Sequence, residues 1–147
     1  MTRSAAALLL ATALVTAPAL AGCGPSPGVT AEEGPAALEA IPGSDVKKVV
    51  LTEEGNEAIG VKTAEVTPGP GEGQLSVPYA AVIYYKDGST WTYTVPEERS
   101  YVRQPVTVAS ISGDVATLTS GPPAGTSVVV VGAPEILGAE LEIDGEQ

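Results

Sequence analysis

The side chains that could perform chemistry in this chain are few. Of its 147 residues, one is a cysteine, Cys23, and none is a histidine. A single cysteine cannot form a disulfide within the chain, and without histidine the common zinc and copper ligand sets are missing. Imidazole acid–base catalysis is excluded for the same reason. The remaining candidates are the 18 acidic residues, whose oxygens suit a hard cation such as calcium.

The acidic residues do not form a pattern typical of catalysis. Three carboxylate pairs are neighbours in the sequence: Glu32–Glu33, Glu53–Glu54 and Glu97–Glu98. Adjacent side chains of a helix or strand point apart, so such pairs do not build a two-carboxylate site. The chain also lacks a glycine-rich phosphate-binding motif. We therefore predict no catalytic residue, no metal site and no cofactor, and expect that the protein is not an enzyme.

The surroundings of Cys23 indicate a different use for its thiol. A basic residue near the start precedes an apolar run over residues 5–20, which is typical of a secretion signal and too short for a convincing membrane span. The stretch Leu20-Ala21-Gly22-Cys23 resembles the lipobox of bacterial lipoproteins. That resemblance implies cleavage before Cys23 and acylation of its thiol, which would hold the protein at the extracytoplasmic face of the cell membrane. The alternative is an ordinary signal peptide with an incidental cysteine.

Composition divides the chain into three parts. Residues 1–22 are the predicted signal peptide, and residues 23–43, rich in Pro, Gly, Ala and Glu, are predicted to be a flexible tether. Residues 44–147 are expected to fold as one domain. The net charge of −11 argues against a nucleic-acid partner, because a phosphate backbone requires a basic surface.

The folding domain is predicted to be mostly β, a small antiparallel barrel or sandwich with one or two short helices. We expect a helix over residues 52–60, with Thr52 as N-cap and Gly60 at its end. The Asp87-Gly88 and Gly113-Asp114 pairs indicate tight turns. Strands are expected over residues 46–51, 61–67, 75–85, 91–95, 102–111, 115–119 and 127–131, and a short closing helix over 134–141. The expected core centres on Val82, Trp91, Val106, Val108, Leu118, Val129 and Val131.

The order of these segments resembles one family. Val77-Pro78, Ala81-Val82, the Asp87-Gly88 turn, the strand 91–95 and the Val106-x-Val108 strand occur in an order similar to the closing part of periplasmic adaptor proteins, the membrane fusion proteins of efflux pumps. Residues 49–66 are similar to the opening of such adaptors. The lipoyl-like domain and the long helical hairpin of full adaptors have no counterpart here, because only the PGPGEG stretch at 68–73 joins the two parts.

The resemblance implies an accessory subunit that docks on an integral membrane transporter of the efflux type. The alternative is a free-standing extracytoplasmic lipoprotein that binds a small ligand or a cell-envelope partner. Tyr84, Tyr85, Arg99 and Arg103 are the candidate partner-binding residues, because tyrosine is common at interfaces and positive charges are rare in this acidic chain. The oligomeric state is left open by the sequence.

Overall fold

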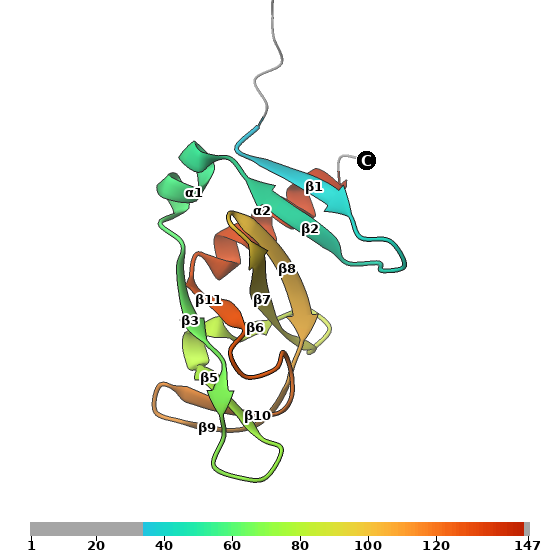
Figure 1. Cartoon of the computed structure of the whole chain (residues 1–147). Coiled ribbons are helices and arrows are strands. Elements are labelled where there is room, and N and C mark those ends of the chain that lie inside the picture. The colour runs from blue at the N-terminus through green and yellow to red at the C-terminus, as the bar shows by residue number, and fades with distance from the viewer. Residues whose placement is uncertain (1–33, 146–147) are drawn as a thin grey trace, which may run out of the picture. The chain divides into compact units, whose positions relative to one another are not determined.

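The structure, a computed structural model, describes residues 34–145. Two antiparallel sheets and two α-helices make up this part of the chain (Figure 1). The predicted mostly-β class with antiparallel sheets and one or two helices is confirmed, and the two sheets do not close into a barrel.

The larger sheet, sheet A, has the strand order β1-β2-β8-β7-β11-β3, with β6 paired to β7. Its strands are β1 (Ala36–Ala40), β2 (Lys47–Leu51), β3 (Lys62–Glu65), β6 (Ile83–Tyr84), β7 (Thr90–Glu97), β8 (Ser100–Pro105) and β11 (Ser127–Val131). Helix α1 (Glu53–Ile59) joins β2 to β3, and helix α2 (Ala133–Gly145) follows β11 and packs against the sheet.

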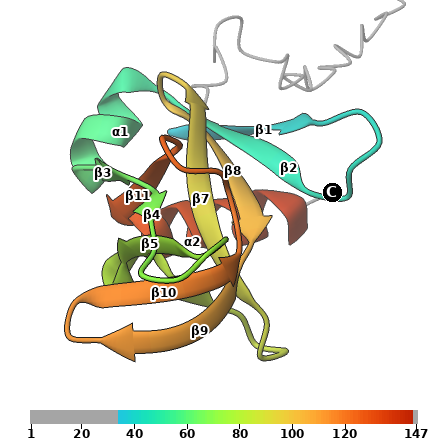
Figure 2. The ribbon, with the colours of Figure 1, turned by 60° about the horizontal axis from the view of Figure 1, so that its bottom comes forward.

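The smaller sheet, sheet B, has the order β4-β5-β10-β9. Its strands are β4 (Thr67–Pro68), β5 (Leu75–Pro78), β9 (Thr107–Ser112) and β10 (Val115–Ser120). In both ribbon views sheet B lies at the end of the domain away from β1 and α1 (Figures 1 and 2).

Two clusters of buried side chains form the core, one for each sheet. The first joins sheet A to α2 and consists of Val49, Leu51, Tyr93, Tyr101, Val129, Ala133 and Ile136. The second lies against sheet B and consists of Val66, Val77, Ala81, Val106, Ala116, Leu118 and Val128. Val128 and Val129 are neighbours on β11 and belong to different clusters, because successive side chains of a strand point to opposite faces.

Local sequence accounts for α1 and the tight turns. The Thr52 hydroxyl accepts a hydrogen bond from the Gly55 backbone N–H at 3.0 Å, and Gly60 ends the helix in the left-handed conformation at φ 68°. The predicted caps are therefore confirmed. At the predicted Asp87-Gly88 turn, the Asp87 carboxylate accepts from the Ser89 backbone N–H at 2.9 Å, and Gly88 has the positive φ that favours glycine.

The segment predicted as one strand over residues 102–111 is divided between the two sheets. It forms β8 in sheet A and β9 in sheet B, with Val106 between them. The Val106 backbone N–H donates to the Thr90 carbonyl at 2.9 Å, and its side chain is buried in the sheet B cluster. Pro105 lacks a donor for the ladder, which suits the end of a strand. Periodicity alone does not reveal such a change of partner.

The folded part begins earlier than the sequence indicated. Strand β1 falls inside the predicted tether of residues 23–43 and pairs antiparallel with β2 over its full length. Its sequence, AALEA, has low β propensity, so local preference did not predict it. Pairing with β2 and packing of Ala36 and Leu38 on the sheet A cluster stabilise it instead.

The predicted core is right in part. Val106, Leu118 and Val129 are buried, and Val82 and Val108 pack against the sheet B cluster as half-buried residues. Trp91 is only half-buried and Val131 is 44% exposed, so both are wrong as core centres. The strand predicted over 75–85 is also interrupted, by a 3-10 turn at Tyr79–Ala81.

Candidate functional site

Three polar side chains meet between sheet A and helix α2. The Arg103 Nε of β8 donates to Glu140 Oε1 of α2 at 2.9 Å, and the Tyr93 hydroxyl of β7 donates to Glu140 Oε2 at 2.6 Å. The side chains of Arg103 and Glu140 are 17% and 5% exposed. Each oxygen of this buried carboxylate therefore has its own donor, as a buried charge requires.

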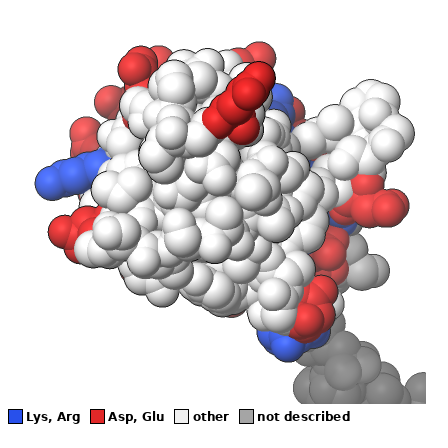
Figure 3. All heavy atoms as spheres, turned by 90° about the horizontal axis from the view of Figure 1, so that it is seen from below, with Lys and Arg blue, Asp and Glu red and all other residues white. Residues whose placement is uncertain are grey.

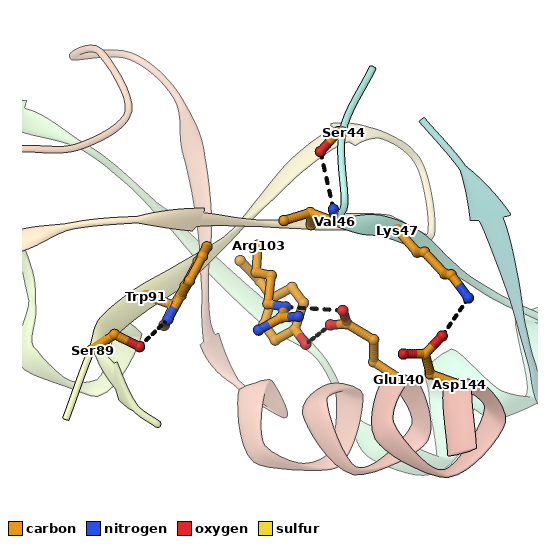
Figure 4. A network of polar contacts seen from close by, with 9 residues as sticks. Ser44, Val46, Lys47, Ser89, Trp91, Arg103, Glu140 and Asp144 are labelled. Atoms are coloured by element: carbon orange, nitrogen blue, oxygen red, sulfur yellow. Dashed lines mark hydrogen bonds and ion pairs between the residues drawn. The ribbon is translucent and has the colours of Figure 1, made fainter. Parts of the chain in front are cut away.

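Two aromatic rings lie close to the guanidinium of Arg103. Its central carbon lies 5.0 Å from the Trp91 ring centroid and 5.5 Å from that of Tyr85. These distances are within the range of cation–π attraction. The Trp91 indole N–H in turn donates to Ser89 Oγ at 2.7 Å, which fixes the ring plane (Figure 4).

Burial sets the protonation state of Tyr93. Desolvation, and then its hydrogen bond to Glu140, raise the pKa of the Tyr93 phenol far above its usual value of 10.0. The hydroxyl therefore remains protonated and donating throughout the physiological range. Tyr101, the other tyrosine of the sheet A cluster, likewise has a raised pKa because burial disfavours the phenolate.

A second ion pair attaches the same helix one turn further along. Asp144, four residues after Glu140, pairs with Lys47 of β2, and Figure 4 shows both carboxylates of α2 directed toward the strands of sheet A. Residues four apart share one face of a helix. The two pairs fasten α2 to β8 and β2, so we assign Arg103, Glu140 and Tyr93 a structural role.

Glu140 was missed by sequence reasoning, although one signal was present. It is buried on α2 together with Ala133 and Ile136, at intervals of seven and four residues that bring all three to one face. A carboxylate on the apolar face of a helix is a reason to search for a buried cation partner. The chain contains several lysines and arginines, and the sequence does not indicate that Arg103 is the one that pairs with Glu140.

Arg99 lies apart from Arg103, at the tip of the β7–β8 hairpin. It is the non-glycine residue with positive φ, at 57°, among the described residues. The left-handed region disfavours a side chain with a Cβ, so this conformation is strained. Its guanidinium is 3.9 Å from the Glu53 carboxylate of α1, and its side chain is 39% exposed.

Backbone contacts place this hairpin beside the start of the described chain. The Leu51 N–H donates to the Arg99 carbonyl at 2.9 Å, and the next N–H, that of Thr52, donates to the Pro35 carbonyl at 3.0 Å. The segment that leads back to Cys23 therefore joins the domain at the end that carries Arg99 and α1, which we call the hairpin end.

The hairpin end is grooved and acidic. An open groove of about 330 Å³ separates α1 from the β7–β8 hairpin, and Glu53, Glu57, Glu98 and Arg99 lie along it. The Tyr101 hydroxyl donates to the Asn56 side chain within this groove. The groove thus presents one guanidinium among three carboxylates.

The candidate residues identified from the sequence occupy different places. Tyr84 is 54% exposed and makes an edge-to-face contact with Tyr79, at 6.4 Å between ring centroids. Tyr85 lies against Arg103, as described above, so the structure joins only these two of the four candidates. The lipobox residues Leu20, Ala21, Gly22 and Cys23 lie outside the described residues.

Comparisons with known proteins identified no relative. No family model, no curated protein and no solved structure matches the chain. Within residues 34–145, no helix is long and apolar enough to cross a membrane, and no cluster of three or more metal-ligating side chains occurs there.

Proposed function

We propose that this chain is a lipid-anchored accessory subunit that docks on an integral membrane transporter of the efflux type, at the extracytoplasmic face of the cell membrane. The observation that carries the proposal is the position of Arg99. A strained, half-buried arginine lies at the end of the domain from which the chain leads back to the lipobox-like sequence at Cys23.

The short stretch of chain between Cys23 and the folded domain supports docking close to the membrane. Gly34 follows Cys23 by eleven residues, which can span at most about 40 Å when fully extended. An acylated Cys23 would keep the hairpin end within that reach of the membrane surface. The acidic groove of the hairpin end would be repelled by anionic lipid headgroups, which favours contact with a protein that projects from the membrane.

The strain at Arg99 supports a role in recognition. A glycine would adopt φ 57° without cost, so the arginine is kept against a conformational penalty of about 1 kcal/mol. Its single ion pair, at 3.9 Å to an exposed glutamate, contributes little in water. A partly exposed guanidinium at a hairpin tip suits a carboxylate or a carbonyl of a partner protein.

Two variants test the proposal. Cys23→Ser should release the protein from membranes or block its processing, as followed by fractionation and immunoblotting. Arg99→Gly should preserve or raise thermal stability and should reduce, by about tenfold or more, the transporter recovered by in-situ cross-linking and mass spectrometry. Lys62→Gly, which removes a positive charge from β3, is the matched control. Unchanged sedimentation of Cys23→Ser, or undiminished recovery with Arg99→Gly, contradicts the proposal.

A second candidate function is favoured by one other groove. An open, mainly apolar groove of about 390 Å³ lies between sheet B and the end of β3, and Glu65 and Asp114 are at its borders. Apolar walls with two carboxylates suit a small amphiphilic cation. A free-standing binding lipoprotein would retain such a ligand and recover no transporter, so the same cross-linking experiment separates the two functions.

A further inference from the structure

Within residues 34–145, four strands lie at the ends of the two sheets, and three of them are irregular. Strand β4 has two residues, one of them Pro68. Strand β9 shifts register twice against β10, and β3 shifts register against β11. A proline or a bulge in an edge strand limits the addition of a further strand. Figure 3 shows a broad face without charged side chains on the side of sheet B, but the end strands of that sheet, β4 and β9, are thus poor templates for pairing.

The fourth end strand, β1, is regular. It pairs with β2 over five consecutive residues without a register shift, and it contains neither proline nor lysine. The Thr52 N–H donates to the Pro35 carbonyl, whereas the adjacent Leu51 N–H donates in the opposite direction, toward β8. Such pairs alternate along an antiparallel ladder. The backbone groups that point away from β2 therefore belong to every second residue of β1, which are Ala36, Leu38 and Ala40.

Open, mainly apolar grooves flank this outer edge of β1. The first, of about 340 Å³, lies between the start of β1 and α2, and Ala36, Glu142 and Ile143 are among the residues that line it. The second, of about 300 Å³, is lined by the paired residues Ala37 and Val50 and by no residue of α2. Successive side chains of a strand point to opposite faces. Small alanines beside two grooves therefore leave room for the alternating side chains of a further strand.

We propose that the outer edge of β1 binds an extended segment of the membrane partner, which adds to sheet A as a further strand. This contact rests on the proposed function and gives it a mode of binding. In strand addition, main-chain hydrogen bonds supply affinity, and pockets for alternate side chains supply specificity. A row of backbone donors and acceptors at the spacing of a strand is matched by another polypeptide backbone, and not by a lipid chain or a small ligand.

Charge indicates which polypeptide binds. Glu142, beside the first groove, is exposed, and it forms no ion pair within residues 34–145. A lysine or arginine of the bound segment would neutralise it. No basic residue occurs between residues 4 and 46, so neither β1 of a second copy nor the chain that precedes β1 can supply that charge. The expected occupant is a segment of a different protein, with alternating apolar residues and one Lys or Arg.

Position agrees with charge. Strand β1 begins at the hairpin end, where the Pro35 carbonyl accepts from Thr52 beside the β7–β8 hairpin. Its outer edge therefore starts close to the segment that leads back to Cys23, and a protein that projects from the membrane can reach it.

Site-specific photo-cross-linking of the full chain in native membranes tests this contact. A benzophenone amino acid replaces Ala37, an exposed residue of β1. The expected adduct is a multi-span membrane protein, joined through a peptide that contains Lys or Arg. Ala109 of β9 is the matched control position, because it is also an exposed alanine of an end strand. It should give less than a tenth of that adduct.

Two substitutions test the mode of binding. Ala40→Pro removes an outward N–H of β1 and leaves the pairing with β2 intact, and it should reduce the Ala37 adduct by about tenfold or more at an unchanged melting temperature. Glu142→Lys should reduce it to a similar extent, because like charges across an interface oppose association. Glu135→Lys, at another exposed position of α2, is the matched control and should leave the adduct unchanged. If Ala40→Pro fails to fold, Glu142→Lys decides.

A benzophenone at Glu98, an exposed residue beside Arg99, reports on the proposed transporter contact separately. A transporter adduct from Glu98 but none from Ala37 would overturn strand addition and leave the proposed function standing, whereas its absence from both positions would overturn both. An Ala37 adduct of twice the chain mass, or one to the chain's own residues before Gly34, would overturn the assignment of the occupant. Equal adducts from Ala109, or an unchanged Ala37 adduct in Glu142→Lys, would overturn the site.

Discussion

Replacement of Glu140 by glutamine tests the central assignment of the structure, that the Arg103–Glu140 pair fastens α2 to sheet A. Glutamine retains the shape of the side chain and an oxygen that can accept from the Tyr93 hydroxyl. The change therefore removes the charge and leaves one acceptor oxygen for the two donors, Tyr93 and Arg103. It leaves the guanidinium of Arg103, 17% exposed, without its counter-ion.

The expected loss in the free energy of unfolding follows from the burial of the Arg103–Glu140 pair. Removal of one partner from a buried ion pair costs about 3–5 kcal/mol, because an uncompensated charge remains. Arg103 retains some contact with solvent and two aromatic neighbours, so we expect the lower limit, about 3 kcal/mol. For Glu39→Gln, which removes the exposed partner of Lys48, we expect a much smaller loss, because exposed ion pairs contribute little in water.

Urea unfolding provides the assay, followed by circular dichroism and by tryptophan fluorescence. Trp91 is the only tryptophan of the chain and lies 5.0 Å from the Arg103 guanidinium, so its emission reports on this cluster directly. A common midpoint for both signals would show that α2 and sheet A unfold together. An unchanged m-value would assign the loss to stability rather than to a change in the exposed surface.

A double-mutant cycle completes the test. Arg103→Met retains the apolar stem and removes the charge, and we expect the double variant with Glu140→Gln to be more stable than the sum of the single losses predicts, by about 2 kcal/mol. If Glu140→Gln costs no more than Glu39→Gln, or if the two single losses simply add, the pair does not fasten the helix and the structural assignment is refuted.

Three further predictions concern neighbouring features. The raised pKa of Tyr93 means that above about pH 10 the unfolded chain releases a proton that the folded chain retains, so stability should fall there by about 1.4 kcal/mol per pH unit for this group; Tyr93→Phe should flatten that fall in pH-dependent urea melts. Trp91→Ala should cost about 1–2 kcal/mol, since the half-buried ring loses its contact with Arg103, and a loss of 3 kcal/mol or more in the same melts would place Trp91 in the core. Gly132→Ala should destabilise severely, by about 3 kcal/mol or more, because Gly132 has φ 93° and an added Cβ would lie 2.5 Å from Ile59 Cγ2; a normal melting temperature would contradict this packing.

Features that depend on a few adjacent residues could be predicted from the sequence. Thr52 and Gly60 define α1, because a hydroxyl at the N-cap and a glycine in the left-handed conformation satisfy the ends of a helix locally. Gly88 and Gly113 likewise define two hairpin turns, because glycine adopts the positive φ that these tight turns require. Alternation of apolar residues then predicts the β class, since the pattern has the period of a strand.

Which segments pair with one another became evident only from the three-dimensional fold. A strand pattern specifies a buried face but no partner, so the sequence did not reveal that the chain passes from sheet A to sheet B at Val106, or that β1 pairs with β2. Nor did it join Glu140 to Arg103 and Tyr93, which are 37 and 47 residues away in the sequence. Such contacts depend on the relative placement of whole elements, and packing of α2 on sheet A brings these three side chains together.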